Sequence, residues 1–346
     1  MPAQTGKMMK LVLNKVPLFS MLAISLSLLG PSTAYAQAKP SPSAGAQKEI
    51  AFGMISSTGN EDYKKRWKPL LDELGAQTGM RVTATASPNI VEDIKEGKIQ
   101  IAWLSNKAAL DAVATGKMKI FAQMMKEDGS VGYSSVLIVP KDSPINSTED
   151  LFKKPGTFKL GYGDPNSTTG YLVPNIFLFK KANIDPARHF KSVIAQGPRA
   201  NFLAAVNKQV DVAVNNTEDM EIFRKEMPDK FKEIKVIWTS QPMPDHPMLV
   251  SRDMPDALRA KVEEFFLKYG SDKANAAHMA TLKNIRGLSG FRKSDNGQLK
   301  PVSILEMHNE IGKVEANAAL SPEEKKQRLA EISSRMQKIN TLISGQ

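Results

Sequence analysis

Hydrophobic and polar positions along this chain follow two periods, one typical of short buried strands and one typical of amphipathic helices. From Glu49 onward, short apolar runs such as Ile50–Ile55 and Val210–Val214 alternate with segments that carry apolar residues on one helical face. In the segment Asp62–Thr78 that face consists of Trp67, Leu70, Leu71 and Leu74. Alternation of this kind predicts an α/β protein whose parallel sheets are covered by helices.

The elements fall into two α/β units of similar size. We expect a first lobe made of residues 49–139 and 245–300, and a second lobe made of residues 140–244. The pattern after Ser251 is helical only, and residues 301–346 are expected to form C-terminal helices. Ligands of open α/β sheets bind beyond the carboxyl ends of the strands, so a cleft between the lobes is the expected binding site.

The N-terminal residues have the order of a secretory signal. Residues 1–36 contain a lysine-bearing region, a short apolar run at Val16–Leu29 and the small-residue sequence Ala34-Tyr35-Ala36. This order predicts cleavage before Gln37 and export to the periplasm, whereas an uncleaved anchor would need an apolar run of about 20 residues. Residues 37–48, rich in Pro, Ser and Ala, are expected to form a disordered linker.

Composition narrows the classes of partner. Without residues 1–36 the chain has 44 basic and 36 acidic residues, a net charge of +8, and these residues are dispersed rather than clustered. This excess weakly favours an anionic partner, although a solvated basic surface is the better explanation of the charge alone. The chain has no cysteine, which excludes disulfides and thiolate metal sites. We expect no cofactor, no metal and no nucleic-acid partner.

The segment Gly161–Gly170 carries the clearest candidate chemistry. It follows a predicted strand, precedes a predicted helix and presents three consecutive hydroxyls, Ser167, Thr168 and Thr169. Hydroxyls and free backbone N–H groups at a helix start can bind an anion, yet Ser and Thr are also the ordinary residues that cap helices. A second hydroxyl cluster that includes Ser57 follows the first strand and has the same two interpretations.

Several longer segments resemble the periplasmic binding component of phosphonate ABC transporters. They are FGMISS, IAWLSN, DGSVGYSSVLIVPKDSPIN, GDPNSTTGYLVP, NKQVDVAVNNTE and KVIWTSQPMPDHP, and the similarity is collinear from about Glu49 to about Leu342. The resemblance implies a type II periplasmic-binding-protein fold with two α/β lobes, crossover strands and a helical C-terminal segment. It also implies a small phosphonate ligand and a membrane permease as partners.

The resemblance assigns roles to single residues where the motifs match. Tyr133 and the hydroxyls of Ser167, Thr168 and Thr169 are expected to hold the phosphonate group. Glu218 is expected to hold part of an aminoalkyl ammonium group.

Other positions depart from the family pattern. The pair Pro198-Arg199 stands where the family pattern has a histidine followed by a glutamate. A tyrosine of the family pattern is missing near Asn89, and His246 replaces an aspartate. Arg199 could supply paired donors or be a surface residue, and His246 could be neutral, protonated or a solvent-exposed loop residue. These changes predict weaker recognition of an aminoethyl tail.

The predicted function is therefore a solute receptor that delivers a phosphonate or related phosphorus oxyanion to an ABC importer. A receptor for phosphite or phosphate is the alternative within this class. An enzyme on the same fold is a less favoured alternative, because the sequence has no cysteine nucleophile, no H-E-x-x-H motif and no visible Ser/His/Asp arrangement.

Overall fold

A computed structural model describes residues 49–55, 60–130 and 132–345 of the chain. The predicted signal segment 1–36, the predicted linker 37–48 and Ser57 lie outside these residues. Within the described ranges, no helix combines the length and the apolar composition needed to cross a lipid bilayer.

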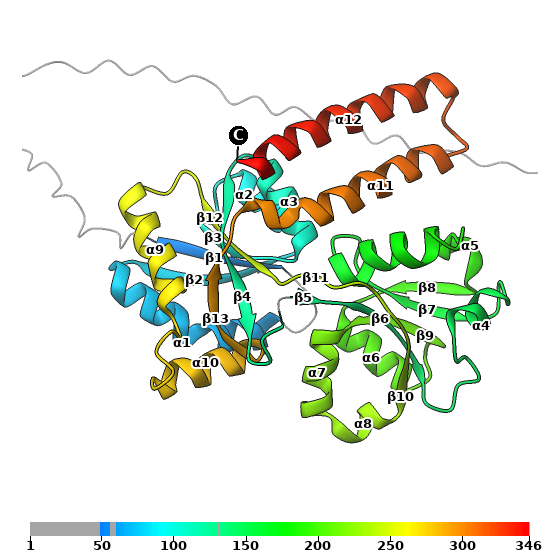
Figure 1. The fold of residues 1–346 in the computed structure, drawn as a ribbon, viewed down its shortest axis with the longest axis horizontal. Helices are drawn as coiled ribbons and strands as arrows, with labels where there is room; N and C mark the ends of the chain where they lie inside the picture. The colour runs from blue at the N-terminus through cyan, green and yellow to red at the C-terminus, as the bar shows by residue number, and fades with distance from the viewer. Residues whose placement is uncertain (1–48, 56–59, 131, 346) are drawn as a thin grey trace, which may run out of the picture. The chain divides into compact units, whose positions relative to one another are not determined.

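The first lobe is built on a six-stranded mixed sheet in the order β13-β4-β12-β3-β1-β2 (Figure 1). Its strands are β1 (Glu49–Ile55), β2 (Arg81–Ser87), β3 (Ile101–Trp103), β4 (Met118–Lys126), β12 (Pro247–Ser251) and β13 (Leu288–Lys293). Strand β1 runs parallel to β2 and β3, while β12 and β13 pair antiparallel with β4.

Helices cover both faces of this sheet, as the apolar periodicity predicts. One face packs on α1 (Asn60–Thr78), α9 (Asp256–Lys268) and α10 (Ala276–Arg286). The other packs on α2 (Ile90–Lys95) and α3 (Asn106–Ala114). The predicted face of α1 is buried, and Trp67 within it is fully inaccessible to solvent. Burial of one apolar stripe per helix is what holds these layers together.

The second lobe is built on a five-stranded sheet in the order β10-β6-β9-β7-β8. Its strands are β6 (Ser135–Pro140), β7 (Lys159–Tyr162), β8 (Ser192–Ala195), β9 (Val212–Asn216) and β10 (Ile234–Thr239). Val136 and Ile138 of β6 pack in one core, and Leu137 and Val139 pack in the other, because successive strand residues point to opposite faces.

The two cores of the second lobe are closed by short helices. One face packs on α4 (Thr148–Phe152), η1 (Thr168–Leu172), η2 (Asn175–Lys180) and α5 (Pro186–His189). The other packs on α6 (Pro198–Val206), α7 (Thr217–Glu226) and α8 (Pro228–Lys232).

Two short strands connect the lobes, and a helical hairpin ends the chain. Strand β5 (Gly132–Tyr133) pairs antiparallel with β11 (Met243–Pro244) between the two sheets (Figure 1). After η3 (Asn296–Leu299), α11 (Lys300–Ala316) and α12 (Pro322–Ser344) form an antiparallel pair that packs against α3. The expected C-terminal helices are therefore present, and Ser321 and Glu324 cap the start of α12 reciprocally.

The sheets differ from the sequence-based expectation in three places. Residues 135–139 fall in the range 49–139 expected for the first lobe, but β6 pairs with β9 and β10 in the second sheet. Strand β4 was not predicted, and β13 lies in a region expected to be helical. Neither β4 nor β13 has a local signal strong enough to define it, because both are stabilised by pairing with strands distant in sequence. The sheets are accordingly mixed rather than parallel.

Candidate functional site

A cavity of about 560 Å³ lies between the lobes, at the carboxyl ends of the parallel strands of both sheets. In the first lobe its wall includes Met54, Asn89 and Trp103, at or just beyond the ends of β1, β2 and β3. In the second lobe it includes Gly163, Gln196 and Asn215, at or just beyond the ends of β7, β8 and β9. This is where an open α/β sheet presents free backbone groups and loop side chains to a ligand.

The loop between β7 and η1 brings hydroxyls to this wall. Gly163 donates its backbone N–H to the Gly170 carbonyl at 3.0 Å, and a Cβ at position 163 would lie only 2.4 Å from that oxygen. Only glycine allows so close a crossing of the chain. Between the two glycines, the Ser167 hydroxyl accepts the Gly170 N–H at 3.0 Å and so caps the following helical turn. A capping hydroxyl still has its own proton to donate to a ligand.

The predicted hydroxyls occupy different depths. Tyr133, Ser167 and Thr169 line the cavity. Thr168 is fully buried and lies behind the wall, where its hydroxyl accepts the backbone N–H of Lys107 at 2.9 Å. A hydrogen bond joins the Thr168 and Tyr133 side chains. Thr168 therefore holds Tyr133 in place and joins the two lobes through Lys107.

Tyr133 is a buried hydrogen-bond donor. Burial, with a smaller effect of the Glu218 and Asp245 carboxylates, raises the pKa of its phenol well above the ordinary value. The ring stacks on His246 with centroids 4.7 Å apart and an interplanar angle of 16°. A phenol that stays protonated and is fixed by stacking can donate to an oxyanion without rearrangement.

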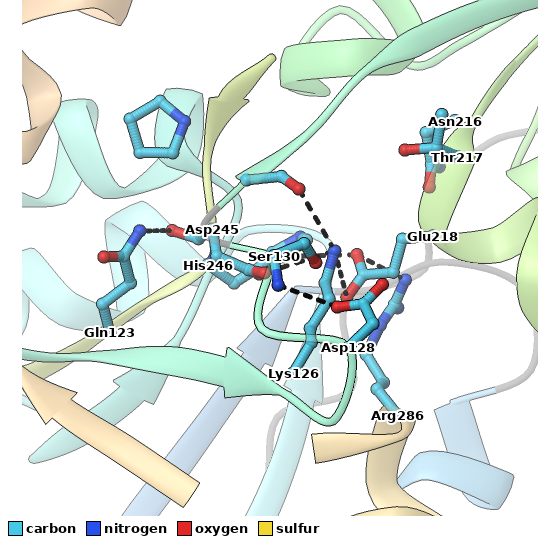
Figure 2. A network of polar contacts seen from close by, with 12 residues as sticks. Gln123, Lys126, Asp128, Ser130, Asn216, Thr217, Glu218, Asp245, His246 and Arg286 are labelled. Carbon is cyan, nitrogen blue, oxygen red and sulfur yellow. Dashed lines mark hydrogen bonds and ion pairs between the residues drawn. The ribbon is translucent and has the colours of Figure 1, made fainter. Parts of the chain in front are cut away.

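A network of buried charged side chains borders the cavity (Figure 2), and its members Arg286 and His246 line the wall. Arg286 extends from the end of α10 and lies 2.9 Å from Glu218 Oε2 and 3.1 Å from Asp219 Oδ1, both on α7. Lys126 of β4 lies 3.3 Å from Asp245 Oδ2 and 3.9 Å from Glu218 Oε1. The contacts of Arg286 join the first lobe to the second. The contacts of Lys126 join the first lobe to α7 and to the residue that follows β11. Sequence analysis missed Arg286 and Lys126, because neither lies in a recognisable binding motif.

The pKa shifts in this network follow from the ion pairs. Burial alone would lower the pKa of the Arg286 guanidinium, but Asp219 and Glu218 raise it well above the ordinary value. Burial opposes ionisation of Asp245, yet His246 and Lys126 hold the pKa of this carboxyl below its ordinary value. Both groups are therefore charged at neutral pH.

His246 is a buried member of the same network, which excludes the solvent-exposed alternative. Its Nδ1 lies 3.3 Å from Asp245 Oδ1 and 3.5 Å from Glu218 Oε2. Ligand atoms of Glu218, Asp245 and His246 lie within 4.8 Å of one another, a spacing that could hold a metal ion. Lys126 and Arg286 already contact these carboxylates, so a metal would have to compete with two fixed cations.

The remaining predicted residues lie towards the solvent. Arg199 lines the cavity, but its side chain is 44% exposed, is ion-paired with Glu226 and stands over the Phe223 ring at 5.3 Å. Arg199 is therefore a rim residue with a compensated charge, and a role of its guanidinium in ligand binding stays a prediction. Asn89 is an exposed wall residue just before α2.

Comparisons with known proteins agree with this architecture. Residues 52–299 match a family described as the periplasmic substrate-binding protein of phosphonate ABC transporters. A phosphonates-binding periplasmic protein of Escherichia coli K12 is 36% identical over 326 residues, which cover 93% of this chain and 92% of that protein.

Solved structures show the same fold. The binding component of an ABC phosphonate transporter from Pseudomonas aeruginosa superposes with a TM-score of 0.77 at 38% identity, covering 87% of this chain and 99% of its own. PhnD1 of Prochlorococcus marinus, solved with methylphosphonate, has a TM-score of 0.66 at 19% identity over 75% and 97% of the two chains, and supports the fold alone. The fold is that of a type II periplasmic binding protein. The chain belongs to the family of periplasmic substrate-binding proteins of phosphonate ABC transporters.

Proposed function

We propose that this protein is a periplasmic receptor that binds a small phosphonate or related phosphorus oxyanion between its lobes and delivers it to an ABC importer. The observation that carries the proposal is the cavity at the strand ends, whose wall presents the hydroxyls of Tyr133, Ser167 and Thr169. Membership of the phosphonate-binding family supports a phosphorus oxyanion as the ligand of these donors. A phosphorus oxyanion needs several hydrogen-bond donors directed at one point, and charged acceptors make such bonds stronger.

The proposed roles differ with the position of each residue. Tyr133, Ser167 and Thr169 donate to the phosphonate oxygens, and Thr168 acts by positioning Tyr133. His246 lines the cavity beside Tyr133 and has Glu218 next to it, whereas Arg199 and Asn89 lie at the exposed rim. Ser57 stays a candidate from the sequence, outside the described residues.

The proposed transport cycle uses the two-lobed architecture. Ligand binding closes the lobes around the cavity, and the closed form docks on the membrane permease. The receptor has no chemistry of its own in this proposal. Residues 1–36 act as an export signal that is removed before Gln37.

A ligand panel tests the proposal directly. Protein purified from Gln37 onward is stripped of ligand by unfolding and refolding, and then titrated calorimetrically with alkylphosphonates, phosphite, phosphate and sulfate. We expect at least one phosphonate to bind more tightly than sulfate, and phosphorus NMR to recover it unchanged. Tightest binding of phosphite or phosphate would favour the alternative receptor, and a chemically altered ligand would favour an enzyme.

A further inference from the structure

Arg286 is a nearly buried cation in the wall of the cavity. Its side chain is only 7% exposed, yet it lines the cavity and contacts Glu218 and Asp219 from the facing lobe. It donates to the Tyr63 hydroxyl at 2.9 Å and stands 5.8 Å from the ring centres of Tyr63 and Trp103. Two carboxylates, one hydroxyl and two aromatic rings therefore hold this guanidinium in place.

The carboxylate of Glu218 is enclosed by the protein's own donors and does not line the cavity. Arg286 approaches its Oε2 at 2.9 Å, Lys126 approaches its Oε1 at 3.9 Å, and Nδ1 of His246 lies 3.5 Å from Oε2. Figure 2 shows these side chains converging on Glu218 from β4, α10 and the residues after β11. A ligand in the cavity thus faces Arg286 and His246, with Glu218 behind them.

Asp219 lines the cavity, but both of its carboxylate oxygens are already engaged. Oδ1 accepts from Arg286 at 3.1 Å, and Oδ2 accepts from the Asn216 side chain at 2.7 Å. Asp245 is fully buried and pairs with Lys126. Each of these three acids therefore has a cation of the described part of the chain within ion-pair distance. Among the described residues, the oxygens of Glu218 and Oδ2 of Asp245 accept no hydrogen bond, so Arg286 and Lys126 compensate their charge by proximity alone.

We infer that Arg286 is a specificity-determining residue that restricts this receptor to phosphorus oxyanions whose other end carries no positive charge. The inference rests on the proposed function. An aminoalkyl ligand would have to displace a tethered guanidinium from Glu218 and Asp219, or place a second cation beside it in a desolvated site. Both are unfavourable, because burying an unpaired or like-charged ion is costly. A neutral alkyl tail brings no second cation and so avoids that cost.

The test compares two ligands of the same size. In n-propylphosphonate a methyl group replaces the ammonium of 2-aminoethylphosphonate, so the ratio of their dissociation constants isolates the charge. Calorimetry on the protein from Gln37 onward is expected to show tighter binding of the propyl compound. Arg286→Met frees Glu218 and Asp219 while keeping an apolar side chain. We expect it to shift the ratio towards the amino compound by about tenfold or more, the size of one charge-assisted hydrogen bond.

Matched variants separate this effect from general changes. Arg66 lines the same cavity and also joins the lobes through Glu226, at 3.2 Å. Arg66→Met therefore removes a cavity cation and an interlobe ion pair without freeing Glu218, and it should keep the parental ratio. Arg286→Lys, which keeps the charge, should also stay near that ratio. We compare the ratio of the two dissociation constants rather than either constant alone. Loss of an interlobe contact changes lobe closure, and therefore changes the affinity for both ligands alike.

The outcomes separate the inference from the function it rests on. A parent that binds the amino compound about tenfold more tightly than the propyl compound refutes the role of Arg286 and leaves the phosphonate receptor intact. An unchanged ratio in folded Arg286→Met also refutes the role of Arg286 and leaves the phosphonate receptor intact. If that variant does not fold, Arg286→Gln decides, because it removes the charge but keeps a polar group beside Glu218 and Asp219. It should shift the ratio towards the amino compound in the same way, and an unchanged ratio would refute the role of Arg286. A parent that binds no phosphonate, phosphite or phosphate refutes both proposals.

Discussion

The hydroxyl of Tyr133 offers the cleanest test of how the oxyanion is held. Tyr133 is 3% exposed, its ring stacks on His246, and its side chain is hydrogen-bonded to Thr168. Tyr133→Phe keeps the ring and its stacking and removes one donor. If that donor binds a phosphonate oxygen, its loss costs about 1.5–3 kcal/mol of binding free energy. This corresponds to a rise of roughly ten- to hundredfold in Kd.

The same variant should affect folding far less than binding. Without ligand, the substitution removes only a neutral hydrogen bond to Thr168, a loss of about 1 kcal/mol in the free energy of unfolding. Calorimetric titration with the tightest phosphonate gives the first quantity, and urea unfolding of the ligand-free protein gives the second. Because burial raises the pKa of Tyr133, the phenol stays neutral through neutral pH and its ionisation contributes no pH dependence to the ratio of affinities.

Tyr162→Phe is the matched control for this substitution. Tyr162 is also buried, donates its hydroxyl to the Tyr171 carbonyl at 3.2 Å and lies outside the cavity wall. We expect the control to lose stability but keep its ligand affinity. Parental affinity in folded Tyr133→Phe, or an equal loss in both variants, would show that the phosphonate group is bound elsewhere.

Three further predictions concern the loop, the charged network and the N-terminus. Gly163→Ala places a Cβ 2.4 Å from the Gly170 carbonyl oxygen, which forces the loop that carries Ser167 to open. Calorimetry should therefore show phosphonate binding that is weaker by at least about tenfold. Parental affinity would mean that the loop is not part of the site. The pKa of Asp245 is lowered in the folded state. Its ionisation therefore stabilises the fold at pH values above the ordinary carboxyl pKa of about 3.9. This stabilisation is lost as the pH falls through the lower pKa of the folded state. Urea unfolding should therefore show Asp245→Asn to be less stable than the parent near neutral pH, with a difference that shrinks as the pH falls below the ordinary carboxyl pKa. A difference that stays constant with pH would contradict the assignment. Mass spectrometry of the exported protein should find a chain that begins at Gln37, and a membrane-bound chain that retains residues 1–36 would refute the cleavage site.

Local sequence patterns predicted the elements whose stability is itself local. The buried face of α1, the reciprocal cap of α12 and the strand before the hydroxyl loop at 167–169 all follow from spacing within one element. The collinear motifs also predicted the family and its fold, which the comparisons confirm. The placement of Thr168 behind the cavity wall did not follow from the motif, because three adjacent hydroxyls look equivalent in sequence but point in different directions on a helical turn.

By itself, the sequence determined most strands and helices, though not β4 and β13, and it determined the hydroxyl loop, because backbone preference, capping and apolar periodicity act over a few residues. The tertiary structure alone decided which sheet receives β6, since a strand's partners are chosen by pairing and packing across the whole lobe. It also decided the charge of the inner cavity. Arg286 meets Asp219 across 67 residues of chain, and both come from helices whose local patterns show only amphipathic surfaces. Ion pairs of this kind depend on where two lobes bring their helix ends together, which no spacing along the chain records.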